Sequence, residues 1–230
     1  YPEISYPTYA MGAQLAGLEA VAVRLEGGRL DLSSISEEHA SRALLLWSNS
    51  PSNPTGGLDD LEAVARWGRD RGVIVASDEC YAEFTWARPP ETVLSGGTDG
   101  VLAVHSLSKR SNAAGLRAGF YAGDAELVTY LKSVRQHSGL MVPGPVQAAA
   151  AAALDDDEHV LAQREIYLRR LELVADGLRA AGYDAQLPEG TFYLWVRIMG
   201  SQADAWEAAE DLARRSGLLV SPGDLYGPAG

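Results

Sequence analysis

Four short segments of this chain carry residues whose chemistry suits a single covalent site. Lys109 supplies a primary amine, which can condense with an aldehyde and later act as a base. Arg117 supplies a planar, permanently charged donor that suits phosphate oxygens. Ligands bind beyond the carboxyl ends of strands in open parallel sheets, so segments that border strands there are expected to converge. The four segments are Asn53-Pro-Thr-Gly56, Asp78-Glu-Cys-Tyr81, Ser106-Leu-Ser-Lys109 and Arg117.

The middle of the chain alternates between strand patterns and helix patterns. Ala43 to Ser48 is apolar and predicts a buried strand, Leu58 to Arg71 has helical spacing, and Val73 to Ala76 predicts a second strand. A connection of this length favours a parallel pair with a right-handed crossover, buried on both faces. Further strands are predicted at 101–104 and 119–122, and further helices from Asp124 and over 146–154.

The last third of the chain follows a different pattern. The acidic run Asp155 to Glu158 predicts the start of a long helix that ends near Ala181, because acidic residues suit a helix N-terminus. After it we expect a strand at 191–198, a helix from about Ala203 to Arg215 and a short strand at 218–220. The predicted fold class is therefore α/β, a mostly parallel sheet sandwiched by helices, with a smaller α+β C-terminal domain.

Composition excludes several function classes. Of the 230 residues, 47% are apolar and 22% are charged, as in a globular protein with a substantial core. The net charge of -12 disfavours binding to nucleic acid and to anionic membranes. Cys80 is the one cysteine and the four histidines show no metal-site spacing, so we expect no metal and a reducing, cytoplasmic location. No apolar run approaches the roughly 20 residues of a membrane helix. The first residue, Tyr1, and the loop-like last stretch indicate that N- and C-terminal segments are missing.

The four segments resemble the signature of fold type I, class I/II pyridoxal-phosphate-dependent aminotransferases. In that signature an Asn-Pro-x-Gly turn precedes an Asp with a Tyr three positions on, and a Ser-x-Ser-Lys motif precedes an Arg eight positions later. The resemblance covers nearly the entire chain. It implies pyridoxal 5'-phosphate as cofactor, Lys109 as the catalytic residue that binds it covalently, and amino transfer in two half-reactions.

The resemblance also implies contacts with the pyridine ring. Asp78 would pair with the ring nitrogen and keep it protonated, because a nearby carboxylate favours the cationic form and strengthens the electron sink. Tyr81 and Asn53 would donate hydrogen bonds to the ring oxygen and stabilise its anionic form. Outside this resemblance, Tyr81 could be an interface tyrosine and Asn53 a turn residue.

Further residues would hold the phosphate and cover the ring. Ser106 and Arg117 would bind the phosphate, and Ser108 would assist them. Tyr9, in Tyr6-Pro-Thr-Tyr9, matches the aromatic position that stacks on the cofactor ring, although a packed tyrosine at a helix start is the alternative.

Longer strings are similar to actinobacterial N-succinyldiaminopimelate aminotransferases of lysine biosynthesis. This similarity implies glutamate and 2-oxoglutarate as one substrate pair, an N-succinylated amino-keto-pimelate as the other substrate, and a homodimer. The relatives' upstream glycine loop for phosphate and downstream arginine for the α-carboxylate lie outside these 230 residues. The strings are Tyr6-Pro-Thr-Tyr9, 12–17, 48–56, 104–109, Met141-Val-Pro143 and 222–228.

The resemblance divides the chain near Arg164. Residues 1–164 would form part of the large cofactor-binding domain, and residues 165–230 would form the interdomain helix and part of the small domain. Dimeric relatives borrow residues across the subunit interface, and the loop from Ser138 to Pro143 is the candidate contribution of this chain.

Other functions stay open at this stage. Ser106-Leu-Ser-Lys109 also fits the S-x-x-K pattern of penicillin-binding and β-lactamase-type acyl enzymes, although S-D-N and K-T-G tripeptides are absent from the sequence. The same cofactor site supports other class I/II aminotransferases and pyridoxal-phosphate-dependent lyases or decarboxylases. A non-enzymatic sensor domain that binds the cofactor is a further alternative.

Overall fold

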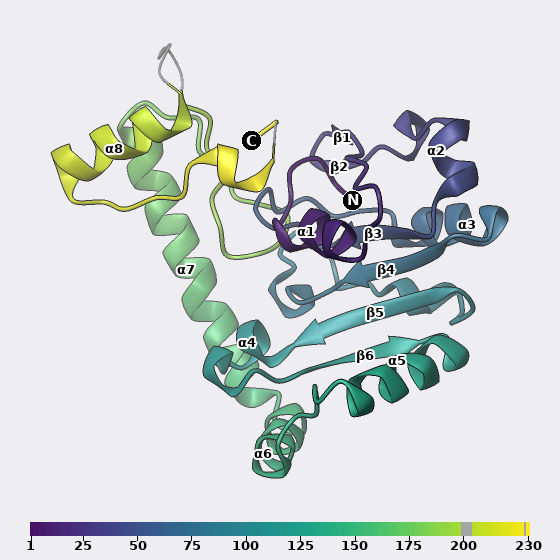
Figure 1. Cartoon of the computed structure of the whole chain (residues 1–230). Helices are drawn as coiled ribbons and strands as arrows, with labels where there is room; N and C mark the ends of the chain where they lie inside the picture. Colours follow the sequence, from purple (N-terminus) through teal and green to yellow (C-terminus); the bar gives the residue numbers. More distant parts are fainter. Residues whose placement is uncertain (199–203, 228) are drawn as a thin grey trace.

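Four strands form the central sheet, in the order β3-β4-β5-β6 (Figure 1). The computed structural model describes residues 1–198, 204–227 and 229–230. β3 (Leu45–Asn49), β4 (Ile74–Asp78) and β5 (Val101–Ser106) are parallel, and β6 (Gly119–Gly123) runs antiparallel to β5. The predicted parallel pair and the mostly parallel sheet are therefore confirmed.

Helix α3 (Leu61–Arg71) connects β3 to β4 and covers one face of the sheet. Its N-terminus is capped by Asp60, whose side chain accepts from Ala63 N at 2.9 Å. Gly72 caps its C-terminus at φ 66°, the left-handed conformation that glycine adopts without a steric penalty. The helix buries Val64 and Ala65 against the sheet, in a core that continues through the residues Leu46, Val73, Val75, Val101 and Ala103.

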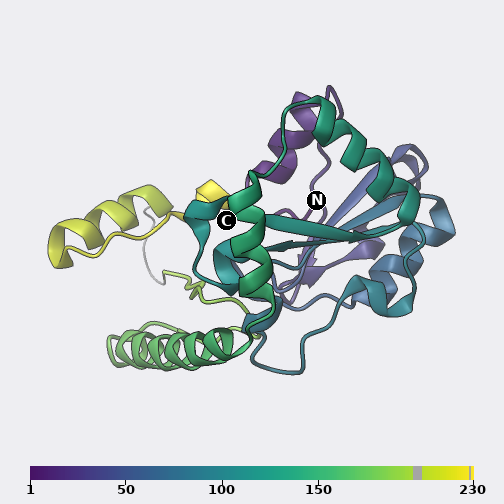
Figure 2. The same ribbon diagram turned by 90° about the horizontal axis from the view of Figure 1, so that it is seen from below.

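Helices α1 (Thr8–Leu15) and α5 (Ala125–His137) lie on the opposite side of the sheet from α3 (Figure 2). Tyr9 of α1 stacks on Trp47 of β3, with ring centroids 5.0 Å apart. Trp47 neighbours Leu46 in the strand, and adjacent side chains of a strand point to opposite faces. The sheet is therefore covered on both sides, as its apolar strands require.

Two elements meet at the end of the sheet to which β5 points. The short helix α4 (Leu107–Arg110) follows β5 directly, and the long helix α7 (Glu158–Ala180) passes beside it (Figure 1). Arg110 is 8% exposed and pairs with Glu83 at 3.3 Å and with Asp157 at 2.5 Å. Arg164 of α7 donates to the backbone oxygens of Glu83 and Thr85. These contacts fix α4 and α7 to the loop that follows β4.

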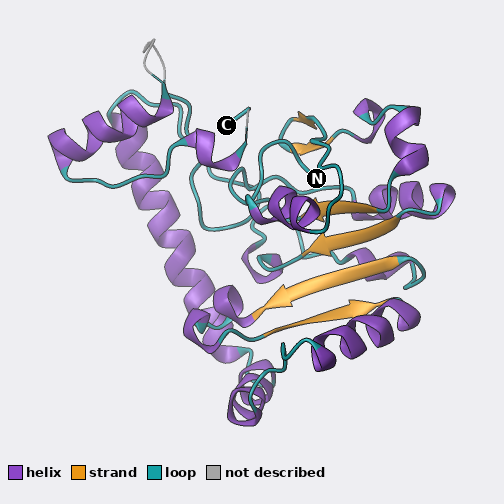
Figure 3. Ribbon diagram, in the orientation of Figure 1, coloured by secondary structure: helices purple, strands orange, loops and turns teal. Residues whose placement is uncertain are grey.

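The remaining elements are short or peripheral (Figure 3). Among the described residues there are also an antiparallel hairpin, a helix before β3, a helix after α5, a C-terminal helix and several 3-10 helices. They are β1 (Leu25–Glu26), β2 (Arg29–Leu30), α2 (Glu37–Arg42), α6 (Gly144–Leu154), α8 (Ala205–Ser216), and the 3-10 helices Leu32–Ser34, Ala82–Phe84, Val93–Gly96, Ala114–Leu116 and Gly223–Tyr226.

Two strand predictions are wrong. Residues 191–198 and 218–220 form no strand, and Gly190, just before the first segment, makes only an isolated bridge with Thr85. A strand requires a paired neighbour, and neither segment has one among the described residues. The helix predicted from about Ala203 is confirmed as α8 from Ala205 onward, whereas Ala203 itself and Pro228 lie outside the described residues.

Two further observations bear on function. In residues 1–198, 204–227 and 229–230, no helix is both long and apolar enough to cross a bilayer. Within the same ranges, no three His, Cys, Asp or Glu side chains gather in a group that could hold a metal ion.

Candidate functional site

Asp78 ends β4 and its carboxylate accepts two hydrogen bonds. The Tyr9 hydroxyl donates to Oδ2 at 2.6 Å, and Cys80 N donates to Oδ1 at 3.1 Å. Tyr9 is 7% exposed, and its burial beside the Asp78 carboxylate raises the pKa of its phenol. Tyr9 is thereby held protonated as a donor to Asp78.

The Asn53 turn is held against β4 by Asn49. Asn49 ends β3, its Oδ1 accepts from Asn53 N at 2.7 Å, and its Nδ2 donates to the Asp78 backbone oxygen at 3.0 Å. The turn is also closed by Gly56 at φ 77°, where a Cβ would lie 2.4 Å from Pro188 Cβ. Only glycine fits this position, because the chain beside it approaches so closely.

Tyr81 lies at the centre of the predicted site. Asn53 Nδ2 donates to the Tyr81 hydroxyl at 3.5 Å, and the Lys109 amine lies 5.8 Å from the Tyr81 ring centroid. Burial raises the pKa of the Tyr81 phenol. Tyr81 therefore carries a proton that it can donate.

Lys109 stands on α4, one turn after the end of β5. Ser106 caps this short helix, because its Oγ accepts from Ser108 N at 3.1 Å. Ser106 is the register partner of Gly119, and Arg117 lies two residues before that glycine. Arg117 has φ 52°, is exposed, and donates to Ala114 O at 3.0 Å. Ser106, Ser108 and Arg117 therefore share one end of the sheet, although the Arg117 guanidinium is directed to a backbone oxygen.

The structure joins the predicted residues in contacting groups. Tyr9 contacts Asp78, Asn53 contacts Tyr81, Lys109 faces Tyr81, and Ser106 contacts Ser108. The position of Tyr9 beside Asp78 does not test its predicted stacking on a cofactor ring. The Ser-x-x-Lys motif that the acyl-enzyme alternative requires opens the short helix α4, with Ser106 as its N-cap.

Sequence reasoning missed two residues of this site. Asn49 ties the Asn53 turn to β4, and the Tyr193 hydroxyl lies 3.0 Å from the Tyr81 hydroxyl. An asparagine at a strand end was a visible signal for the first. Nothing local marked Tyr193, because it lies 112 residues from Tyr81 in the chain.

The residues present fit pyridoxal phosphate. Asn53 Oδ1 is buried and has no hydrogen-bond partner among the described residues, while Nδ2 of the same side chain lies 3.5 Å from the Tyr81 hydroxyl. The surrounding set combines the Lys109 amine, the Asp78 carboxylate and the Tyr81 hydroxyl. These groups suit an aldehyde, a pyridinium nitrogen and a ring oxygen respectively.

Comparison with known proteins agrees with this reading. The family model described as aminotransferase class I and II matches residues 1–228. A probable aminotransferase of Mycobacterium tuberculosis is 46% identical over all of this chain and 54% of its own length. The 4-dedimethylamino-4-oxo-anhydrotetracycline transaminase of Streptomyces rimosus is 42% identical over all of this chain and 63% of its own length.

A solved structure supports the fold as well. The probable N-succinyldiaminopimelate aminotransferase of Thermus thermophilus superposes with a TM-score of 0.86 at 29% identity, over 100% of this chain and 63% of that one. The chain thus spans somewhat more than half the length of the proteins that it resembles. On the family match and the shared fold, the chain belongs to the class I and II aminotransferases, a family dependent on pyridoxal phosphate.

Proposed function

We propose that the protein containing this chain is a pyridoxal-phosphate-dependent aminotransferase that moves an amino group between glutamate and a keto acid. The observation that carries the proposal is the convergence on Tyr81, where the Lys109 amine and the Asn53 amide lie against one buried phenol. Asp78 stands at the neighbouring strand end, and Asn49 joins it to the Asn53 turn.

Each residue has a proposed role. When bound, pyridoxal phosphate supplies the aldehyde and the electron-withdrawing ring. Lys109 would hold the group covalently at its aldehyde carbon, and the free Lys109 amine would be the base that accepts a proton from the substrate α-carbon. Asp78 favours the protonated ring nitrogen. Asn53 and Tyr81 donate to the ring oxygen.

The other proposed contacts concern the phosphate and the ring face. Ser106, Ser108 and Arg117 would hold the phosphate, with the guanidinium turned from the Ala114 oxygen toward the anion. Tyr9 would cover the cofactor ring. To do so, its hydroxyl must give up the hydrogen bond to Asp78 Oδ2.

We propose N-succinyl-diaminopimelate in lysine biosynthesis as the substrate. Similar sequence strings and the name of the Thermus thermophilus protein support this choice. Another class I/II aminotransferase activity is the second candidate, since a tetracycline transaminase is 42% identical to the chain. A lyase, a decarboxylase or a sensor domain using the same site would bind the cofactor without forming 2-oxoglutarate from glutamate.

We infer the following organisation for the whole protein. It forms a homodimer in the cytoplasm, and residues 138–143 contribute to the partner's site. Residues 1–164 belong to the large domain and residues 165–230 to the interdomain helix and part of the small domain. Arg164, at the proposed division, lies within α7 and is anchored to Glu83 and Thr85 of the first part.

The chain offers a matched test, because Lys109 and the exposed Lys132 are its two lysines. The intact protein is mixed with pyridoxal phosphate, reduced with borohydride, digested and mapped by mass spectrometry. We expect the adduct at Lys109, its loss in Lys109→Ala, and its retention in Lys132→Ala. With glutamate and N-succinylated keto substrate we expect 2-oxoglutarate. An adduct that survives Lys109→Ala would overturn the site. An adduct without 2-oxoglutarate from this pair would overturn the N-succinylated substrate, and an adduct without 2-oxoglutarate from glutamate and any keto acid would overturn the transaminase proposal.

A further inference from the structure

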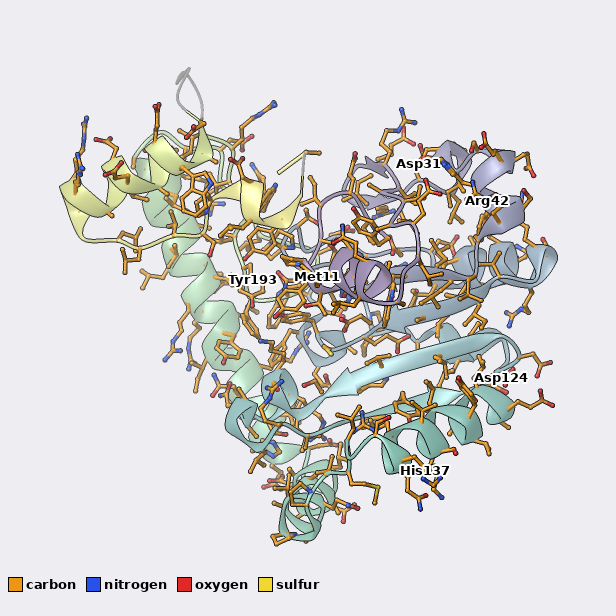
Figure 4. The ribbon with its side chains drawn as sticks, in the orientation of Figure 1. Met11, Asp31, Arg42, Asp124, His137 and Tyr193 are labelled. Atoms are coloured by element: carbon orange, nitrogen blue, oxygen red, sulfur yellow. The ribbon has the colours of Figure 1, made fainter. Side chains whose placement is uncertain are left out.

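Tyr193 reaches the candidate site from the segment that follows α7. Its hydroxyl lies 3.0 Å from the Tyr81 hydroxyl, and the two rings meet edge to face with centroids 5.8 Å apart. Figure 4 shows Tyr193 near the middle of the molecule, between α7 and the sheet. The site residues predicted from the sequence all lie between Tyr9 and Arg117, so Tyr193 comes from a different part of the chain.

The backbone before Tyr193 is held from two directions. Gly190 N donates to Gly56 O at 2.9 Å, and Trp86 Nε1 donates to Thr191 O at 2.7 Å. Thr191 is fully buried and has φ 66°, a conformation that a β-branched residue rarely adopts. Such a conformation persists only where the surroundings enforce it, and it often marks a functional segment.

The direction of the hydrogen bond between the Tyr81 and Tyr193 hydroxyls determines whether Tyr81 can donate its own proton to a ligand. Each phenol has one proton. If Tyr81 gave its proton to Tyr193, it would have none for a ligand. If Tyr193 gives its proton to Tyr81, the Tyr81 oxygen accepts from both Tyr193 and Asn53, and the Tyr81 proton stays free.

We propose that Tyr193 is a positioning residue, which donates to the Tyr81 oxygen so that the Tyr81 proton is directed at the ring oxygen of bound pyridoxal phosphate. This inference rests on the proposed function. A hydroxyl that accepts hydrogen bonds becomes a stronger donor. Tyr193 therefore strengthens the stabilisation of the ionised ring oxygen without touching the cofactor itself.

The proposal predicts a spectroscopic effect. Stabilising the ionised ring oxygen favours the unprotonated form of the cofactor bound to Lys109. In the intact, cofactor-loaded protein, Tyr193→Phe should therefore raise the pH midpoint of the visible band. A modest cooperative effect predicts that the bound cofactor then has a proton affinity about threefold higher. Tyr130→Phe, on the exposed surface of α5, should leave the midpoint unchanged.

Two further measurements separate this role from simple packing. The effect of Tyr193→Phe should vanish in a Tyr81→Phe background, because the coupling passes through Tyr81. Replacing Tyr193 with 3-fluorotyrosine, a better donor with the same ring, should lower the midpoint.

The outcomes are distinguishable. An unchanged or lowered midpoint in Tyr193→Phe, with a normal band in the unmodified protein, would overturn this inference and leave the proposed function standing. Absence of any visible band in the unmodified protein would overturn both.

Discussion

The Tyr9 hydroxyl donates to Asp78 Oδ2 at 2.6 Å and joins two residues that lie 69 positions apart in the chain. Asp78 is also the carboxylate proposed to pair with the ring nitrogen of the cofactor. Tyr9 is also the ring proposed to cover the cofactor, and its hydroxyl must leave Oδ2 to do so, so binding of the cofactor would break this hydrogen bond.

Removing the Tyr9 hydroxyl should therefore strengthen the binding of pyridoxal phosphate. We expect Tyr9→Phe to keep the ring stacked on Trp47 and to tighten pyridoxal phosphate binding by up to about tenfold, part of the value of a hydrogen bond to a charged group. Titration of the intact, cofactor-free protein, followed by absorbance, measures the dissociation constant. Tyr6→Phe, 51% exposed, is the control and should have no effect. Weaker binding by Tyr9→Phe would instead mean that its hydroxyl helps to hold the cofactor.

Replacing two helical glycines with alanine should change the free energy of unfolding in opposite directions. A Cβ on Gly68 of α3 would lie 2.5 Å from Val75 Cγ2 and 2.7 Å from Val73 O, so Gly68→Ala must push the helix from the sheet. We expect the free energy of unfolding to fall by about 1–3 kcal/mol. Gly177 of α7 has open space around it, so Gly177→Ala should raise stability by about 0.5–1 kcal/mol. Urea unfolding of the intact protein measures both, and a loss of stability at Gly177 would contradict the packing described for α7.

Asp124 should make stability depend on pH. It lies where β6 turns into α5 (Figure 4), and backbone hydrogen bonds from Gly100, Leu127 and Glu126 lower the pKa of its carboxyl. A carboxyl whose pKa is lower in the folded state stabilises the protein above its ordinary pKa, and this contribution is lost as the pH falls through the folded value. Asp124→Asn should therefore lower the melting temperature at pH 7, and the difference should shrink at about pH 3. The exposed Asp70→Asn is the control, and an equal difference at both pH values would refute the effect.

Local patterns in the sequence were sufficient for much of the fold. The apolar runs and the helix between them predicted the parallel pairing of β3 with β4, because a crossover of that length leaves few alternatives. Asp124 marked the start of α5 correctly, since capping depends on neighbouring backbone groups. The strand predicted from composition at residues 191–198 does not form, because strand formation depends on a pairing strand that composition does not reveal.

The sequence by itself predicted which residues would hold pyridoxal phosphate, because their types and spacing resemble the signature of the family to which the chain belongs. Only the tertiary structure decided which side chains the hydroxyls of Tyr9 and Tyr81 contact. Tyr9 with Asp78, and Tyr81 with Tyr193, are contacts between elements distant in the chain. Such contacts are set by how helices and loops pack around the sheet, and no local pattern encodes that packing.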